Sequence, residues 1–246
     1  MTVTYFGASQ ALNTHPALSA PAASGRWGTC DIRGLRQPAA LVLNPHAGRK
    51  LGLDTNTHGR DEVQAALRAE GIPFDLWETE RPGHATDLAR RAVSERRELV
   101  IAAGGDGTIH EVARGLVNTD TVLALMPLGS VMNLARTLWI PRDPPGAART
   151  IAMGRVLAMD VGRVGGRVFL EAAGVGLVAG LFGYFNKLDS SQPTLGVLQA
   201  ALRYVRQVET ANVSLEFDEG RLDASTLVVN IANAPYMGAA LAIAPE

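Results

Sequence analysis

Between residues 99 and 116 an apolar run leads straight into a glycine-rich turn and then into a helical pattern. The run is Leu99–Ala103, the turn is Gly104-Gly-Asp-Gly-Thr108, and the helical pattern continues from Ile109. A buried strand, a tight turn and a helix in direct succession are typical of sheets with parallel strands, where the helix crosses back over the sheet. The segment therefore predicts an α/β fold.

The same strand-and-helix unit recurs along the first half of the chain. Predicted strands at 39–43, 73–78, 98–103 and 122–126 alternate with helical patterns at 61–70, 84–97, from 108 and from 131. Such alternation requires parallel strands with helices on both faces, and ligands of these sheets bind at the carboxyl ends of the strands. We therefore expect a site in the loops after Leu43, Glu78, Ala103 and Met126.

The segments before and after this region differ from it in composition and in the pattern of apolar residues. The first 37 residues mix Ala, Ser, Thr, Pro and Gly without an apolar period, so we expect 1–37 to be a disordered leader. After a linker at 141–146, β-type runs predict a second domain; they lie at 156–164, 167–173, 212–217 and 226–231, the first two joined as a hairpin through Gly165-Gly166. The predicted domains are 38–141 and 142–246.

Charge and cysteine content narrow the classes of partner. The chain has 23 Lys and Arg against 24 Asp and Glu, a net charge of −1, which gives no electrostatic case for binding nucleic acid or an anionic membrane. Lys50 and Lys187 are its lysines, so we expect a fixed phosphate contact to be an arginine. Cys30 is the single cysteine, which excludes an internal disulfide and fits a cytoplasmic protein.

The glycine-rich turn has the chemistry of a phosphate site. Glycines let backbone N–H groups approach an anion closely, and the start of a helix adds a partial positive charge. Asp106 would repel a bare phosphate, so we expect it to hold Mg²⁺ through water or to anchor a cation. The competing interpretation is a plain turn, in which Thr108 and Glu111 form a capping box; for Glu111 capping is the favoured role.

Three other loops end strands on the same edge of the predicted sheet. Asn44–Gly48 offers backbone donors, with Arg49 or Lys50 close by; Thr79 offers a hydroxyl; and Pro127–Ser130 leads into a helix with Asn133 and Arg136. Each is ordinary turn chemistry alone. Their placement at successive strand ends predicts one cleft lined by amides and hydroxyls, as in nucleotide sites of open α/β sheets.

In this order and spacing, Asn44–Gly48, Gly104–Thr108 and Pro127–Arg136 resemble the catalytic domain of diacylglycerol kinases, of the bacterial lipid kinases related to them and of sphingosine kinases. The resemblance covers 38–246, because 160–163, 169–176 and 233–238 look like the β-sandwich domain of that family. It implies an N-terminal parallel-sheet nucleotide-binding domain, like that of NAD kinase and diacylglycerol kinase, followed by a β-sandwich substrate domain that we expect to be truncated.

The resemblance also implies the chemistry and the residues that carry it. The implied reaction is phosphorylation of a lipid hydroxyl by ATP with Mg²⁺, with Asp106 in a charge network beside the transferred phosphate. We expect Mg²⁺ to arrive with ATP, since no spacing of His, Asp or Glu forms a preformed metal cage. Carried onto this chain, the nucleotide contacts are Asn44, Pro45, His46, Ala47, Gly48, Thr79, Gly105, Asp106, Gly107, Thr108, Ile109, His110, Glu111 and Ser130.

The sequence departs from the family pattern in three places. Met132 replaces a polar amide, and Glu171 stands where Asn is commoner. In similar proteins a later Asp-Gly segment helps to hold Mg²⁺, and an acidic residue taken to be the general base follows it, whereas this sequence stops at Glu246. We therefore expect either a piece of a longer gene product or a degenerate copy.

The leading hypothesis is a lipid kinase that transfers the γ-phosphate of ATP to a diacylglycerol-like lipid. It implies a cytoplasmic protein in transient peripheral contact with a membrane, with no nucleic-acid partner and with a homodimer left open. One alternative is a catalytically incomplete nucleotide-binding or regulatory homologue. The other is a small-molecule kinase like NAD kinase, which also carries Gly-Gly-Asp-Gly; the first and fourth loops argue against it.

Overall fold

The computed structural model describes residues 2–4, 27–50, 53–54, 58–177, 180, 204–206, 208–234, 236–237 and 241–242. The chain folds into two compact units. The first unit is Met1–Glu171 together with Asn233–Glu246, and the second is Ala172–Ala232. The candidate site lies in the first unit.

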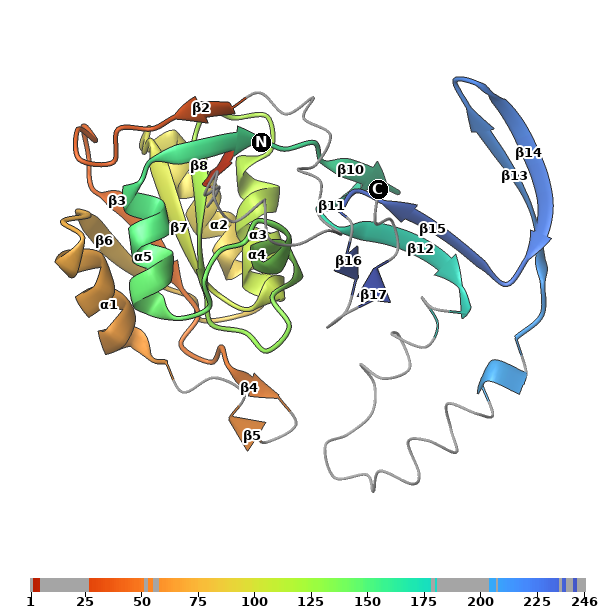
Figure 1. Ribbon diagram of the computed structural model, residues 1–246, viewed down its shortest axis with the longest axis horizontal. Helices are drawn as coiled ribbons and strands as arrows, with labels where there is room; N and C mark the ends of the chain where they lie inside the picture. Colours follow the sequence, from red (N-terminus) through yellow and green to blue (C-terminus); the bar gives the residue numbers. More distant parts are fainter. Residues whose placement is uncertain are drawn as a thin grey trace, which may run out of the picture. The chain divides into compact units, whose positions relative to one another are not determined.

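A seven-stranded sheet forms the centre of the first unit (Figure 1). Its spatial order is β2-β9-β1-β8-β7-β3-β6. The strands are β1 (Thr2–Thr4), β2 (Trp27–Thr29), β3 (Ala39–Leu43), β6 (Phe74–Glu78), β7 (Leu99–Gly104), β8 (Val122–Pro127) and β9 (Arg155–Ala158). The run from β6 to β1 is parallel, and β9 is antiparallel to β1 and β2. The predicted α/β class is confirmed.

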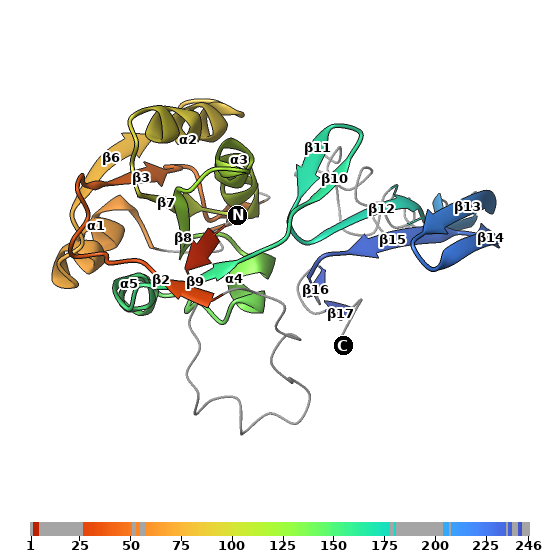
Figure 2. The same cartoon turned by 90° about the horizontal axis from the view of Figure 1, so that it is seen from above.

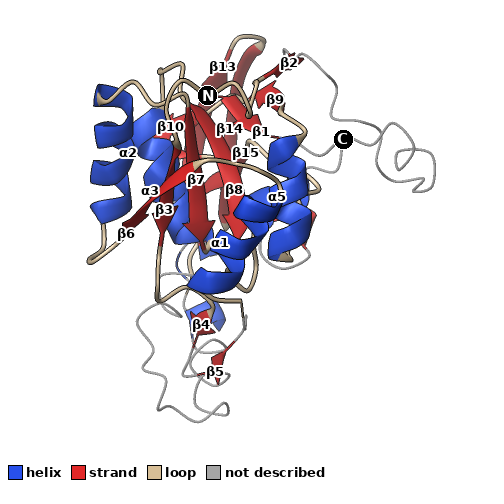
Figure 3. Cartoon of the chain, turned by 90° about the vertical axis from the view of Figure 1, so that its left-hand side faces the viewer, coloured by secondary structure: helices blue, strands red, loops and turns tan. Residues whose placement is uncertain are grey.

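Helices cover both faces of this sheet, as the alternation of strands and helices requires. Figures 2 and 3 show α2 and α3 on one face and α1 and α5 on the other. Every residue of β3, β7 and β8 is buried, which explains why these strands are continuous apolar runs. The helices of the unit are α1 (Arg60–Ala69), α2 (His84–Ser94), α3 (Asp106–Leu116), α4 (Asn133–Thr137) and α5 (Pro144–Ala152).

The amino-terminal region differs from the disordered leader that the sequence predicts. Strand β1 pairs with β8 and β9, and β2 pairs with β9. Ile32 is buried in the core, and the Arg36 backbone N–H donates to Glu98 at 2.8 Å. Strands of three residues are too short to show an apolar period, so the sequence pattern does not predict them. Residues 5–26 of the predicted leader lie outside the described residues.

The chain also divides at a different place from the predicted linker. Helix α5 and strand β9 follow Pro141, yet they pack within the first unit, where α5 contacts α1 and β8. Strands β10 (Gly162–Val164) and β11 (Arg167–Phe169) form the predicted antiparallel hairpin. Gly165 and Gly166 have φ of +53° and +75°, the left-handed values that such a two-residue turn requires. The assignment of the later residues to a substrate domain stays a prediction.

The second unit consists of antiparallel pairs. Strand β12 (Ala172–Gly176) pairs with β15 (Val228–Ala232), and β13 (Ala211–Phe217) pairs with β14 (Gly220–Thr226). Strand β14 was not predicted, because its polar residues give no clear alternation. Two-residue pairs of the first unit complete the described strands: β4 (Arg49–Lys50) with β5 (Leu53–Asp54), and β16 (Tyr236–Met237) with β17 (Leu241–Ala242). The antiparallel pairs agree with the predicted sandwich, whose truncation stays a prediction.

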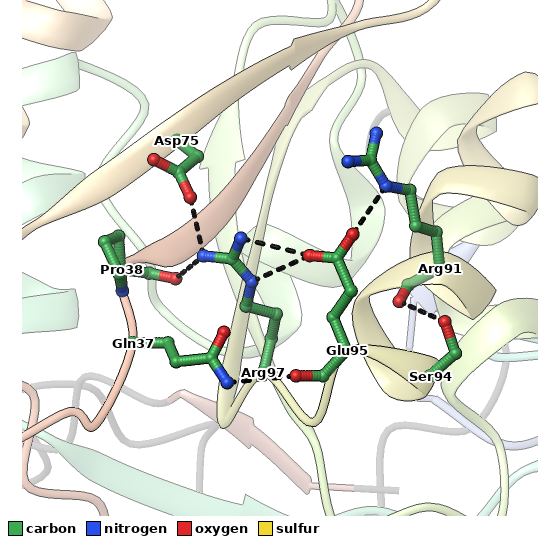
Figure 4. A network of polar contacts seen from close by, with 7 residues as sticks. All are labelled: Gln37, Pro38, Asp75, Arg91, Ser94, Glu95 and Arg97. Carbon is green, nitrogen blue, oxygen red and sulfur yellow. Dashed lines mark hydrogen bonds and ion pairs between the residues drawn. The ribbon is translucent and has the colours of Figure 1, made fainter.

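A network around Arg97 joins the amino ends of the parallel strands (Figure 4). Its guanidinium donates to the Pro38 carbonyl at 2.7 Å, to Asp75 at 2.6 Å and to Glu95. Burial would lower the pKa of Arg97, but its bonds to the two carboxylates outweigh burial and raise it. The start of β3, the start of β6 and the segment before β7 are thereby held together, at the end of the sheet opposite the candidate site.

Candidate functional site

A pocket of about 300 Å³ lies at the carboxyl ends of β3, β7 and β8. Parallel strands bring these loops to one edge of the sheet, as the sequence predicts. Three loops line the pocket, with Asn44, His46, Ala47 and Gly48 from the first, Gly105, Asp106, Gly107 and Thr108 from the second, and Gly129, Ser130 and Val131 from the third. A wider hollow of about 820 Å³ lies along α1, but its described lining comes from that helix and the residue before it. The pocket at the strand ends is therefore the candidate site.

The start of α3 supplies the pocket with free hydrogen-bond donors. Helix α3 begins at Asp106, and no side chain caps it. The first N–H to find a backbone acceptor is that of Ile109, which donates to the Gly105 carbonyl at 3.1 Å. Among the described residues, the N–H groups of Asp106, Gly107 and Thr108 have no acceptor. Together with the helix dipole, these donors favour an anion.

Thr108 links the second pocket loop to the first. Its Oγ1 accepts a hydrogen bond from Asn44 Nδ2 at 3.1 Å. A Cβ atom on Gly104 would lie 2.5 Å from Cβ and Oγ1 of Thr108, so only glycine leaves room for this side chain. Asn44 in turn accepts the His46 N–H through Oδ1 at 2.9 Å. The side chains of Arg49 and Lys50, which the sequence analysis placed near phosphate, lie outside the described part of the chain.

Asp106 directs its carboxylate at the start of α4. Oδ2 accepts the Met132 N–H and Oδ1 accepts the Asn133 N–H, both at 2.9 Å. Met132 has φ of +55°, a left-handed value that is unusual for a residue other than glycine, and these bonds hold it there. The negative charge therefore has two backbone donors of its own, which explains how an acidic residue can sit in a loop suited to anions. Its predicted role toward Mg²⁺ stays a prediction.

The third pocket loop packs backbone to backbone against the second. The Leu128 N–H donates to the Gly104 carbonyl at 2.9 Å. A Cβ atom on Gly129 would lie 2.7 Å from Cα of Gly105 and 2.7 Å from Sδ of Met132. The Met132 side chain is buried, and its sulfur accepts the Gly129 N–H at 3.2 Å. Met132, noted as a departure from the family pattern, thus serves as packing beneath this loop.

One guanidinium contacts the same loop from the segment before α5. Arg142 Nη2 donates to the Gly129 carbonyl at 2.8 Å and to the Ser130 carbonyl at 3.0 Å. The sequence predicts a linker at 141–146, which includes Arg142, and does not reveal this contact. Gly129 and Val131 also line the pocket on either side of Ser130, although they are not among the predicted site residues. No local signal could have found Arg142, because the contact depends on the fold.

Five of the predicted contacts do not line the pocket: Pro45, Thr79, Ile109, His110 and Glu111. Ile109 is fully buried in the core. The backbone of Thr79 continues the sheet, its N–H donating to the Leu43 carbonyl at 2.9 Å. Their predicted contact with a nucleotide stays a prediction, without support from the pocket.

Glu111 caps a helix, but not its own. Its carboxylate accepts the N–H groups of Gly83 at 2.9 Å and Ala85 at 3.2 Å, at the start of α2. The capping box with Thr108 is therefore wrong. The physical reason is that α3 packs along α2, so Glu111 reaches the free donors of the neighbouring helix.

His110 lies close to an acidic residue outside the pocket lining. Its Nε2 lies 3.6 Å from Glu171 Oε1, and Asn133 Nδ2 donates to Glu171 Oε2 at 2.8 Å. The Glu171 side chain is only 12% exposed. Glu171, the second departure from the family pattern, thus belongs to a polar cluster next to α4.

The described residues hold neither a metal cluster nor a membrane span. Within the described ranges, no three His, Cys, Asp or Glu side chains are grouped so that they could hold a metal ion. No helix in the same part of the chain is long and apolar enough to cross a membrane.

Comparison with known proteins gives consistent matches. Residues 38–164 match the family model of the diacylglycerol kinase catalytic domain. The chain is 28% identical over 188 residues to a diacylglycerol kinase of Staphylococcus saprophyticus and 30% identical over 189 residues to one of Staphylococcus aureus. Each match covers 75% of this chain, and the chain spans 60% and 58% of the length of these relatives.

A solved structure gives the same picture. The crystal structure of a diacylglycerol kinase from Bacillus anthracis matches with a TM-score of 0.62 and 27% sequence identity. The match covers 82% of this chain and 66% of that one. The pocket loops described above all fall within the residues that match the family model.

Proposed function

The chain belongs to the diacylglycerol kinase catalytic-domain family, and from that premise we propose that it transfers the γ-phosphate of ATP to the hydroxyl of a diacylglycerol-like lipid. The observation that carries the proposal is the set of free backbone donors at the start of α3, which line a pocket at the strand ends. Such donors suit the phosphate chain of a nucleotide.

We assign the nucleotide phosphates to the three loops of the pocket. The Gly105–Thr108 segment offers the helix start, and Ser130 offers a hydroxyl and a backbone N–H. Asn44 holds Thr108 in place from the first loop. Fixed donors of this kind orient the phosphates and stabilise the charge that develops during phosphoryl transfer.

Mg²⁺ fits this pocket as an ion that arrives with ATP. Asp106 is the one carboxylate among the described residues that line it, and each of its oxygens already accepts one N–H. A single carboxylate acting with phosphate oxygens and water matches the way Mg²⁺ binds in kinases. When bound, the ion supplies neutralisation of phosphate charge, and Asp106 would hold it through water.

We further propose a cytoplasmic protein that meets its lipid substrate at a membrane surface. With a net charge of −1, electrostatic attraction to anionic lipid would contribute little, so the contact would be brief.

The test is transfer of radiolabel from γ-labelled ATP to diacylglycerol in detergent micelles, with NAD assayed in parallel. The chain should label the lipid, and Asp106→Asn should lower the rate about a hundredfold through lost charge stabilisation. Asp120→Asn, an exposed acid without a contact among the described residues, is the matched control and should keep the rate of the unaltered chain.

Two outcomes would contradict the proposal. Label in NAD but not in lipid would indicate a small-molecule kinase. A calorimetric signal for ATP without transfer to any lipid would indicate a nucleotide-binding homologue without catalysis.

A further inference from the structure

The Arg142 side chain has an unusual set of partners for an arginine. Both of its hydrogen bonds go to successive backbone carbonyls, those of Gly129 and Ser130, at 2.8 and 3.0 Å. Within the described ranges no carboxylate pairs with it. The adjacent acid, Asp143, is occupied as the N-cap of α5, where Oδ1 accepts the Gly146 N–H at 2.8 Å. The guanidinium of Arg142 therefore binds one loop of the pocket.

The backbone that carries Arg142 is itself fixed. Pro141 restricts the chain before it, and the capped start of α5 with Pro144 restricts the chain after it. A guanidinium anchored in this way is preorganised to hold its two carbonyls in one orientation.

Holding these carbonyls also orients the N–H groups of the next residues. In a planar trans peptide the C=O and the following N–H point in opposite directions. When the Gly129 and Ser130 carbonyls face Arg142, the N–H groups of Ser130 and Val131 point away from it. In the described structure neither N–H has an acceptor, and both residues line the pocket.

Asp106 holds the next two peptide groups of the loop by the opposite interaction. Its carboxylate accepts the N–H groups of Met132 and Asn133. Within residues 129–133, the Arg142 guanidinium therefore fixes two carbonyls and the Asp106 carboxylate fixes two N–H groups. The two N–H groups left over, those of Ser130 and Val131, are successive donors that make a concavity suited to an anion.

We propose that Arg142 is a positioning residue of the phosphate pocket, which turns the Ser130 and Val131 N–H groups toward the phosphates of the nucleotide. This rests on the proposed function for the identity of the anion. Arg142 acts through the loop and does not need to touch the nucleotide.

Calorimetric titration of the 246-residue chain with ATP and with adenosine tests the proposal. Arg142→Gln should raise the Kd for ATP about tenfold, the effect of losing one good charge-assisted contact, and leave the Kd for adenosine unchanged. Arg149→Gln is the matched control. Arg149 is exposed on α5, and its side chain has no hydrogen bond or ion pair among the described residues.

Amide hydrogen exchange gives a second readout that needs no ligand. Exchange of the Leu128, Met132 and Asn133 amides should be faster in Arg142→Gln than in Arg149→Gln, because the loop opens more often. A general loss of folding would instead weaken adenosine binding and speed exchange throughout the sheet.

Equal ATP affinity in the two variants, or equal protection of these amides, would overturn the role of Arg142. If the unaltered chain binds ATP but labels no lipid, the kinase proposal fails while the difference between ATP and adenosine still decides the role of Arg142. If the unaltered chain does not bind ATP, both proposals fail.

Discussion

Asp106 shows how one side chain can reconcile two requirements. A loop suited to phosphate needs free N–H groups, and a negative charge in that loop would oppose the ligand. The carboxylate instead accepts hydrogen bonds from two N–H groups across the pocket, those of Met132 and Asn133, and so caps the start of α4. A residue with a proposed part in charge stabilisation is thus also a structural cap.

Removing this cap should lower stability. Asp106→Ala leaves the two N–H groups without an acceptor and should reduce the free energy of unfolding by about 1–2 kcal/mol. Asp106→Asn keeps one side-chain oxygen and should lose less. Urea unfolding of both variants beside Asp120→Asn measures the difference. An unchanged free energy of unfolding in Asp106→Ala would contradict the capping role.

The residue scale also limits what sequence alone can assign. The capping role predicted for Glu111 is right in kind, but Glu111 caps α2 rather than α3. A spacing along one helix cannot reveal the neighbour on which that helix packs. Arg142 is missed for the same reason, since its partners lie about a dozen residues earlier in another loop.

Among the elements, the contact between the second and third pocket loops depends on Gly129. A Cβ there would meet the Gly105 backbone and the Met132 sulfur, both at 2.7 Å. Gly129→Ala should therefore force the loops apart and lower the free energy of unfolding by about 1–3 kcal/mol. Gly107→Ala is the control, because a Cβ at Gly107 meets nothing within 4 Å and alanine favours the helix.

Thermal unfolding should distinguish the two glycine variants. The Tm of Gly129→Ala should fall, and that of Gly107→Ala should hold or rise. A Tm for Gly129→Ala equal to that of the unaltered chain would mean that the loops are not in backbone contact.

The network at the other end of the sheet predicts a pH dependence. Hydrogen bonds from Arg91 and Arg97 lower the pKa of Glu95 from its ordinary value of 4.5. A folded pKa below the unfolded one contributes stability that is fully present above pH 4.5 and is lost as the pH falls through the folded value. Glu95→Gln should therefore lower Tm at pH 7, and its difference from the unaltered chain should shrink below pH 4.5.

Glu70→Gln is the control for this series, because Glu70 lies at the end of α1 without a side-chain partner among the described residues. Melting curves by circular dichroism between about pH 3 and pH 8 provide the comparison. A difference in Tm that stays constant across this range would exclude a contribution from the Glu95 charge.

For the whole molecule, the sequence predicted the parallel part of the sheet well. Strands β3, β6, β7 and β8 lie where strands are predicted to alternate with helices; β3, β7 and β8 are buried throughout, and β6 at the edge of the sheet is half-buried. The short strands β1, β2 and β9 complete the sheet by contacts distant in sequence. No apolar period marks β1 and β2, so they could not be predicted. Strand β9 overlaps the β-type run predicted at 156–164, but its place in this sheet depends on the fold.

The candidate site was predictable to the same extent as the sheet. Once the strands are parallel, the loops after β3, β7 and β8 must meet, and nine of the predicted residues line the pocket. The other five do not line it, because lining depends on the direction of each side chain. Packing sets the direction of a side chain, as it does for Ile109, whose side chain is buried in the core.

The place of β1 in the sheet has a consequence for the order of folding. Val3 pairs with Leu123 on one side and Leu157 on the other, partners roughly 120 and 150 residues away. Closing such large loops costs entropy and slows folding. We expect β6, β3, β7 and β8 to assemble first and β1 and β9 to close the sheet last. Strand β1, which precedes the other strands of the sheet along the chain, would then be among the last to reach its native contacts.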